Sequence, residues 1–174
     1  LVRPHDVCVF DGVRYSPGWM GCAMSYKFLA QAARAKQLPA LEVMEDDVEF
    51  PENYEQRRTV INSYLAHYAG EWDVFSGLMA VVHPDTRVLK VEQYQGETFI
   101  TINRMISTVC NTYAPTALDL LANWDAANTD AETNTVDRYM QRHPSLRVVV
   151  TIPFLVGHEE ELDSSLWGFS NVRY

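Results

Sequence analysis

The sequence predicts an α/β fold: a mixed sheet flanked by helices. Short apolar, often β-branched runs alternate along the chain with longer segments in which apolar residues recur every three or four positions. The chain has 174 residues, 47% of them hydrophobic. That is enough to bury one sizeable core and too little for two ordinary domains. We therefore expect a single domain over residues 1–174.

The first quarter of the chain is expected to contain a strand, a helix and a second strand. Residues 7–10 are a short apolar run closed by an Asp-Gly turn, which predicts a strand near one edge of the sheet. From Gly21 to about Lys36 the apolar spacing is helical. The stripe that defines this helix consists of Cys22, Tyr26, Leu29 and Ala33. Residues 40–44 then form a mostly apolar strand that runs directly into three acidic residues.

The rest of the chain continues the alternation. Gly96 separates two strand-like runs and predicts a hairpin, and Pro115 suits the first turn of a helix. The remaining helices are expected at residues 53–68, from 115 onward and at 132–142, and the strands at 72–75, 88–91, 98–102, 106–113 and 146–154.

The charge of the chain restricts its partners. A formal net charge of -9 repels phosphate backbones, so we expect no nucleic-acid partner. The same field repels a nucleotide cofactor unless a divalent cation lies between carboxylates and phosphates. The acidity therefore favours a metal.

The cysteines and the hydropathy pattern indicate a protein without disulfides or a membrane span. Cys8, Cys22 and Cys110 are odd in number and irregularly spaced, which fits buried thiols better than a disulfide framework or a zinc site. No run approaches the roughly 20 apolar residues of a membrane span, and no basic-then-apolar leader opens the chain. We expect a cytoplasmic location. The secretory lumen is the alternative, because a leader would be removed there.

The triplet Glu45-Asp46-Asp47 is the strongest candidate for a functional site. Three consecutive carboxylates repel one another, and a cation would relieve this repulsion. Carboxylate oxygens suit Mg²⁺ or Mn²⁺, which keep positions for water and substrate phosphates. Strand alternation would turn Glu45 and Asp47 to the same side. The alternative is a solvated acidic turn at the start of the next helix.

Two segments around this triplet resemble glycosyltransferase family 25. Residues 21–25 (GCAMS) open a helix, and residues 43–48 (VMEDDV) follow about twenty positions later. These lipooligosaccharide and collagen galactosyltransferase-like enzymes typically have Gly-Cys-Ala-Leu-Ser-His and Leu-Glu-Asp-Asp-Val at this interval. The chain departs from the family pattern at Tyr26, where His is usual. We also expect N-terminal residues to be missing, and with them the first strand that family members use for the nucleotide.

The resemblance implies a GT-A-like, Rossmann-type sheet and a metal-dependent, inverting glycosyltransferase. The expected donor is a nucleotide diphosphate sugar, with galactose on uridine diphosphate first. The acceptor would be a glycan or protein hydroxyl. In such an enzyme, Mn²⁺ or Mg²⁺ neutralises the leaving diphosphate, and a carboxylate removes the proton of the acceptor.

Roles for individual residues follow from the resemblance and from side-chain chemistry. The expected metal ligands are Glu45, Asp47 and His158, since GT-A enzymes often add a late histidine and imidazole suits Mn²⁺ better than Mg²⁺. Asp73 and Asp137 are the candidate general bases. The expected substrate-binding residues are Trp19, Gly21, Ser25, Tyr26, Glu45, Asp46, Ser164 and Ser165. The alternatives are core packing for the aromatic residues and solvated positions for the base candidates and the histidine.

Two other functions compete with this hypothesis. An inert binding module could have kept the fold and lost donor binding with its first strand. A Mg²⁺-dependent phosphotransfer domain would also use an acidic strand end, but the sequence lacks the Asp-x-Asp-x-Thr nucleophile motif of that class.

Overall fold

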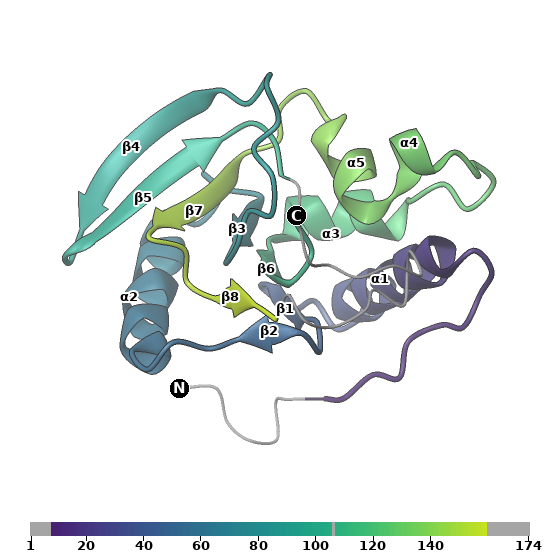
Figure 1. The fold of residues 1–174 in the computed structure, drawn as a ribbon, viewed down its shortest axis with the longest axis horizontal. Helices are drawn as coiled ribbons and strands as arrows, with labels where there is room; N and C mark the ends of the chain where they lie inside the picture. Colours follow the sequence, from purple (N-terminus) through teal and green to yellow (C-terminus); the bar gives the residue numbers. More distant parts are fainter. Residues whose placement is uncertain (1–7, 106, 160–174) are drawn as a thin grey trace.

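Six strands form one mixed sheet in the computed structural model, which describes residues 8–105 and 107–159 (Figure 1). The strand order is β1-β6-β3-β7-β5-β4. Only β3 and β7 are parallel neighbours, and all other neighbours are antiparallel. The strands are β1 (Leu41–Met44), β3 (Val74–Ser76), β4 (Val88–Tyr94), β5 (Glu97–Ile102), β6 (Cys110–Tyr113) and β7 (Val148–Ile152). The expected α/β class with a mixed sheet is confirmed.

One face of the sheet packs against most of the helices. These are α1 (Gly18–Ala35), α3 (Pro115–Ala122), α4 (Ala131–Asn134) and α5 (Val136–Gln141). The core on this side contains Val74, Tyr113 and Val148 from the strands. Trp124, just after α3, is buried here, and its indole N–H donates to the carbonyl of Asn134 at 2.9 Å. This face contains the larger of the two apolar clusters.

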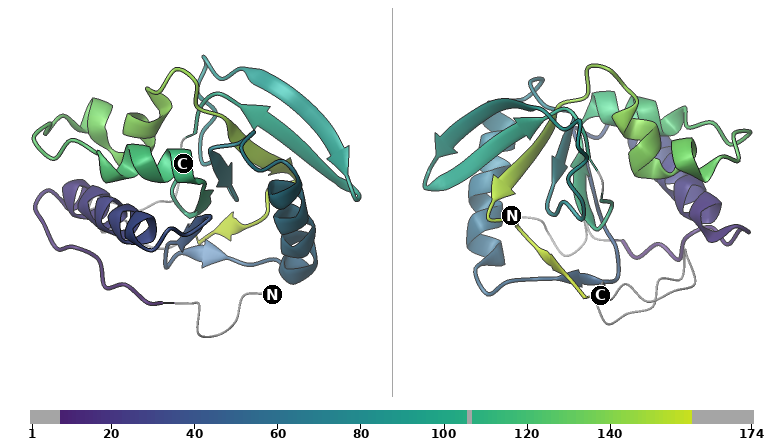
Figure 2. Two further views of the ribbon diagram at one scale, coloured as in Figure 1. Left: turned by 180° about the vertical axis from the view of Figure 1, so that it is seen from behind. Right: turned by 45° about the horizontal axis from the view of Figure 1, so that its top comes forward.

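The opposite face is covered by α2 (Tyr54–His67), as Figure 2 shows from two further sides. Phe99 of β5 stacks on Tyr64 of α2 with 3.7 Å between ring centroids. Arg57 of α2 is buried and pairs with Glu97 at 2.9 Å. Side chains alternate between the two faces along each strand, so Phe75 packs here and its neighbour Val74 packs on the other side.

A second, two-stranded sheet closes one edge of the molecule. β2 (Val48–Glu49) pairs antiparallel with β8 (Gly157–His158), so Val48 lies opposite His158. Sequence patterns did not predict these strands, because two residues are too short to show periodicity. Among the described residues, no helix combines the length and apolar character that crossing a membrane requires.

Several predicted boundaries are wrong. Residues 8–10 have no regular secondary structure, so the expected edge strand is absent from the described residues. The first helix starts at Gly18, directly after its N-cap Pro17, and not at Gly21. The expected strand at 106–113 begins only at Cys110. The expected strand at 146–154 spans only Val148–Ile152.

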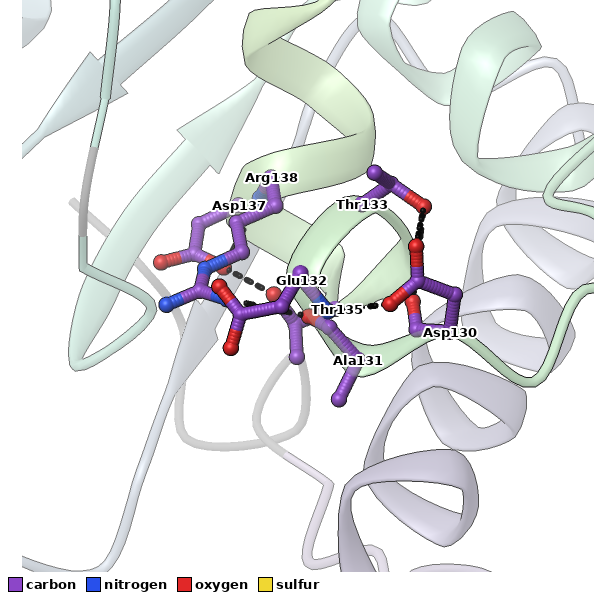
Figure 3. Close-up of polar contacts among 7 residues, drawn as sticks. All are labelled: Asp130, Ala131, Glu132, Thr133, Thr135, Asp137 and Arg138. Carbon is purple, nitrogen blue, oxygen red and sulfur yellow. Dashed lines mark hydrogen bonds and ion pairs between the residues drawn. The ribbon is translucent and has the colours of Figure 1, made fainter.

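The expected helix at 132–142 is divided in two at Thr135, which has an extended backbone. The cause lies in the side chains around the break, which Figure 3 shows in part. Asp130 caps α4 by accepting from the Glu132 N–H at 2.9 Å. The buried Asn134 amide donates to the carbonyls of Asp125 and Asn128, both at 2.7 Å. These bonds anchor α4 to the preceding loop and leave Asp137 in the first turn of a new helix.

Candidate functional site

The acidic triplet lies at the end of the sheet where the carboxyl ends of β1, β3 and β7 lie side by side. β1 and β3 are each antiparallel to β6, and β7 is parallel to β3, so the carboxyl ends of all three meet there. The Glu45 N–H donates to Val109 O at 2.8 Å, and the Gly77 N–H donates to Cys110 O at 2.7 Å. Open α/β sheets bind ligands beyond this edge.

Asp47 and His158 form a pair at this edge. The β2–β8 register brings them together, with 3.0 Å between Asp47 Oδ2 and His158 Nε2. The Glu159 N–H donates to Asp47 O at 2.9 Å and holds the backbone in place. The other carboxylate oxygen, Asp47 Oδ1, is buried and has no hydrogen-bond partner within residues 8–105 and 107–159. A buried carboxylate oxygen without a partner is costly, and a cation would relieve that cost.

Glu45 faces a different set of groups. The Tyr26 hydroxyl lies 3.3 Å from Glu45 Oε1 and 3.1 Å from Thr108 O. Burial raises the pKa of Glu45, and the negative charge of Asp47 adds to this shift. The charged form of Glu45 is therefore less favourable than that of a solvated glutamate, and a nearby positive charge would offset this cost.

The triplet is a turn and not a continued strand. β1 ends at Met44, and the chain turns at Asp46 and Asp47 before β2 begins. The alternation that would have turned Glu45 and Asp47 to the same side therefore does not apply, and Asp46 is exposed. Within the described ranges, no group of three or more His, Cys, Asp or Glu side chains is arranged to hold a metal ion. A divalent ion held by Asp47 and His158 would have to take its other ligands from water and phosphate.

Asp137, one of the two candidate bases, lies on the same side of the sheet as Cys22 of α1. Burial raises the pKa of Cys22 to about 12, and the charges of Glu45 and Asp137 add to this shift. The charges of both carboxylates therefore act on the same thiol. One oxygen of Asp137 accepts from the Thr135 hydroxyl at 2.8 Å, and the other is directed away from this turn (Figure 3).

Asp73, the other candidate base, lies away from the triplet, just before β3 begins. Arg147 binds it at both oxygens, at 2.9 and 3.1 Å, and the Thr116 hydroxyl donates at 2.6 Å. Burial favours a higher pKa for Asp73, but the hydrogen bonds from Arg147 and Thr116 outweigh it and lower the pKa. The structure thus gives Asp73 a structural position, and it does not bring the residue to the site.

The residues expected to bind substrate near α1 serve packing in this structure. Trp19 and Tyr26 are buried in the core. The Ser25 hydroxyl accepts from the Val13 N–H at 2.7 Å and donates to Gly21 O at 2.8 Å. These bonds bind the segment before α1 to the helix. Ser164 and Ser165 lie outside the described residues.

Gly21 allows the segment before α1 to cross the helix closely. A Cβ atom at this position would lie 2.3 Å from the Val13 carbonyl oxygen and 3.1 Å from the Tyr15 nitrogen. We expect Gly21→Ala to displace this segment and to lower the free energy of unfolding by about 1–3 kcal/mol. Limited proteolysis would then cut residues 12–16 faster than in the wild type. Ala35→Ser, at an exposed position on the same helix, is a control for altered helix chemistry, and unchanged proteolysis in Gly21→Ala would refute the contact.

A groove adjoins the Asp47–His158 pair. It has a volume of about 410 Å³, within the usual range of ligand sites. Its lining consists of Glu49, Phe50, Pro51, Asn53, Arg57, Pro153, Phe154, Leu155, Val156 and Gly157. Glu49 and Gly157 are the β2 and β8 residues next to Val48 and His158, so the groove begins one residue away from the pair along each strand, and neither Asp47 nor His158 lines it. Sequence patterns did not predict this groove. The Phe50-Pro51 pair was the signal for it in the sequence, and the structure shows that Phe50 is exposed.

Comparison with known proteins adds no relative. No family model matches the chain, and no curated protein matches it significantly. The resemblance to family 25 therefore stays a prediction.

Proposed function

We propose that this chain is a metal-dependent, inverting glycosyltransferase of the GT-A type, similar to family 25. The observation that carries the proposal is the Asp47–His158 pair at the carboxyl ends of β1, β3 and β7, with a buried Asp47 Oδ1 that no described residue contacts by a hydrogen bond. Such a pair suits a divalent ion, and the net charge of -9 makes an ion necessary for binding a diphosphate.

Each residue then has a defined task. Asp47 and His158 would hold Mn²⁺ or Mg²⁺, and Glu45 would add negative charge beside them. A divalent ion here supplies charge neutralisation for the leaving nucleotide diphosphate. Asp137, which lies near the same thiol as Glu45, is the better candidate to take the proton of the acceptor hydroxyl. Asp73 is occupied by Arg147 and is not assigned a catalytic task.

The groove next to the pair would receive the sugar acceptor. Phe50 is exposed and lies edge-to-face with Tyr54, 4.7 Å between centroids. Exposed aromatic rings flanked by amide and carboxylate groups are suited to binding sugar rings. Asn53 and Glu49 provide such polar groups along the same lining. The acceptor in this proposal is a glycan or a hydroxyl-bearing protein, and the donor is uridine diphosphate galactose.

Metal-dependent stabilisation by uridine diphosphate tests the binding half of the proposal. With Mn²⁺ present and nucleotide at a hundred times its dissociation constant, the folded state should gain about 2.7 kcal/mol. Either compound alone should give much less, because the ion must link the carboxylates to the phosphates. Thermal unfolding and isothermal titration measure this effect.

The same titration separates the alternatives. Stabilisation that does not require the metal, or that is unchanged in Asp47→Ala, would contradict the proposed site. Metal-dependent binding without transfer of sugar to any acceptor or to water would favour the inert binding module. Phosphate transferred to an aspartate would favour the phosphotransfer domain.

A further inference from the structure

The strand β4 has an open edge. It ends the order of the main sheet and, among the described residues, pairs only with β5. Figures 1 and 2 show it at the rim of the molecule, with no described element beyond it. With seven residues it is the longest strand, and an exposed edge of this length is a template for pairing with another strand.

The two faces of β4 carry different side chains. Lys90 and Glu92 face α2, where Lys90 Nζ lies 2.8 Å from Glu92 Oε2 and the Tyr64 hydroxyl donates to the same oxygen at 2.7 Å. Val88 and Val91 face the other way. They are 61% and 58% exposed.

The exposed valines lie at the rim of an apolar strip on the face opposite α2 that becomes buried toward β7. Val91 lies opposite the half-buried Ile100 of β5, which in turn lies opposite the buried Val150 of β7. Ile152, two residues further along β7, is 48% exposed on this face. Adjoining exposed apolar side chains at a sheet edge indicate an interaction surface.

The hairpin limits how a second strand can pair with β4. Tyr94 and Glu97 flank its two-residue loop, in which Gln95 and Gly96 both have positive φ. The alternation of an antiparallel ladder, counted from this pair, leaves the backbone N–H and C=O groups of Val91 and Gln93 at the open edge. A second copy related by a two-fold axis pairs antiparallel, and these positions must then meet each other.

The charges of Lys90 and Glu92 favour one of the registers that pair the middle of β4 with the middle of a second β4. With Val91 opposite itself on the axis, Lys90 lies opposite the partner's Glu92, and this pairing occurs twice. A shift of the register in one direction puts the Lys90 side chains of the two copies opposite each other. A shift in the other direction does the same with the two Glu92 side chains. Both shifts bring like charges together, which is unfavourable.

We propose that the chain forms a symmetric dimer through β4, which pairs antiparallel with β4 of a second copy around Val91. The two sheets then join into one, and the exposed side chains of Val88 and Val91, beside the half-buried Ile100, continue across the junction. Lys90 and the irregularity between Val88 and Lys90 are features that often protect sheet edges. Here the irregularity stops short of residues 90–94, and Glu92 complements the lysine. The dimer is independent of the proposed enzymatic function.

Sedimentation velocity over a protein concentration range of about 1–500 μM tests the proposal. A seven-residue strand supplies fewer residues than the roughly 20–30 per side of a typical stable interface, so we expect a weak, concentration-dependent dimer. Lys90→Glu or Glu92→Lys alone should raise the dissociation constant at least about tenfold, because each puts two pairs of like charges across the axis. An equimolar mixture of the two variants should associate again, because each supplies the charge that the other needs.

This rescue by mixing cannot result from misfolding of either variant. Circular dichroism confirms the fold, and Lys36→Glu and Glu55→Lys, at exposed positions away from β4, repeat the two charge changes without affecting association. A wild-type chain that is monomeric throughout the range overturns the proposal. So does a dimer that both variants leave intact, or a mixture of the two variants that stays monomeric.

Discussion

Asp47→Ala should reduce sugar transfer from uridine diphosphate galactose with Mn²⁺ by about 10²–10³-fold or more, at unchanged fold. This follows from the proposed role of Asp47 as the carboxylate that holds the ion against the diphosphate, where the negative charge of the leaving group develops. The substitution removes the buried Oδ1, which lacks a partner among the described residues, and also the contact of Oδ2 with the part-exposed His158, so the net cost in stability should be about 1 kcal/mol or less. Product formation measured by mass spectrometry, together with thermal unfolding, distinguishes lost chemistry from lost structure.

A matched control comes from the neighbouring helix. Glu55 is exposed in the first turn of α2 and does not line the groove. Glu55→Gln removes the same charge and should keep the wild-type rate. The rate of sugar transfer by His158→Ala should lie between those of Asp47→Ala and Glu55→Gln, because one proposed ligand is lost and the carboxylate of Asp47 stays. Full activity of a folded Asp47→Ala variant would sink the proposed function.

Asp73→Ala should have the largest effect on stability, lowering the free energy of unfolding by about 2–3 kcal/mol. The substitution leaves the Arg147 guanidinium, its backbone N–H and the Thr116 hydroxyl without their acceptor. The loss is smaller than for a fully buried pair, because the Arg147 side chain is 35% exposed. Denaturation by urea, monitored by circular dichroism, measures the change.

Glu132→Ala is the comparison for this result. Glu132 pairs with Arg138 at a similar distance, 2.7 Å, but its side chain is 83% exposed. Exposed pairs contribute about 0–1 kcal/mol, so this variant should unfold almost like the wild type. Equal losses in the two variants would show that Asp73 does not stabilise the fold through Arg147. Loss of sugar transfer in a folded Asp73→Asn variant would restore Asp73 as a candidate base.

The pH dependence of the Asp73 contribution has a definite sign. The pKa of Asp73 is lowered in the folded chain, so the folded state binds the proton less readily than the unfolded state. Its stabilisation is therefore complete above the ordinary pKa of 3.8 and is lost as the pH falls through the lower folded value. The stability difference between the wild type and Asp73→Asn should narrow below pH 3.8. A difference that stays constant down to that range would contradict the assignment.

Part of the candidate site could be predicted from the sequence. Asp47 and His158 were predicted as ligands from their residue types and from the family resemblance, but nothing in the sequence showed that they meet. Their contact depends on β2 and β8, two strands of two residues each that lie more than a hundred positions apart. Pairs this short have no hydrophobic period, so only long-range pairing reveals them.

Strand order also separated the two candidate bases. In the sequence, Asp73 and Asp137 were equivalent acidic residues beside a strand or a helix. The fold puts Asp73 just before β3 in contact with Arg147, and it puts Asp137 near the thiol that Glu45 also influences. The connections between the strands decide the direction of each strand in the sheet, and hence which of its ends lies at the site.

The sequence by itself determined the alternation of helices and strands and the placement of the acidic triplet after β1, because hydrophobic periodicity and turn chemistry act over a few residues. The tertiary structure alone decided that the chain turns at the triplet and continues as β2, and that the segment before α1 crosses the helix at Gly21. It also decided that β4 is an edge strand with no further strand beside it among the described residues. Those features depend on contacts between distant segments, and local patterns do not encode which segments will meet.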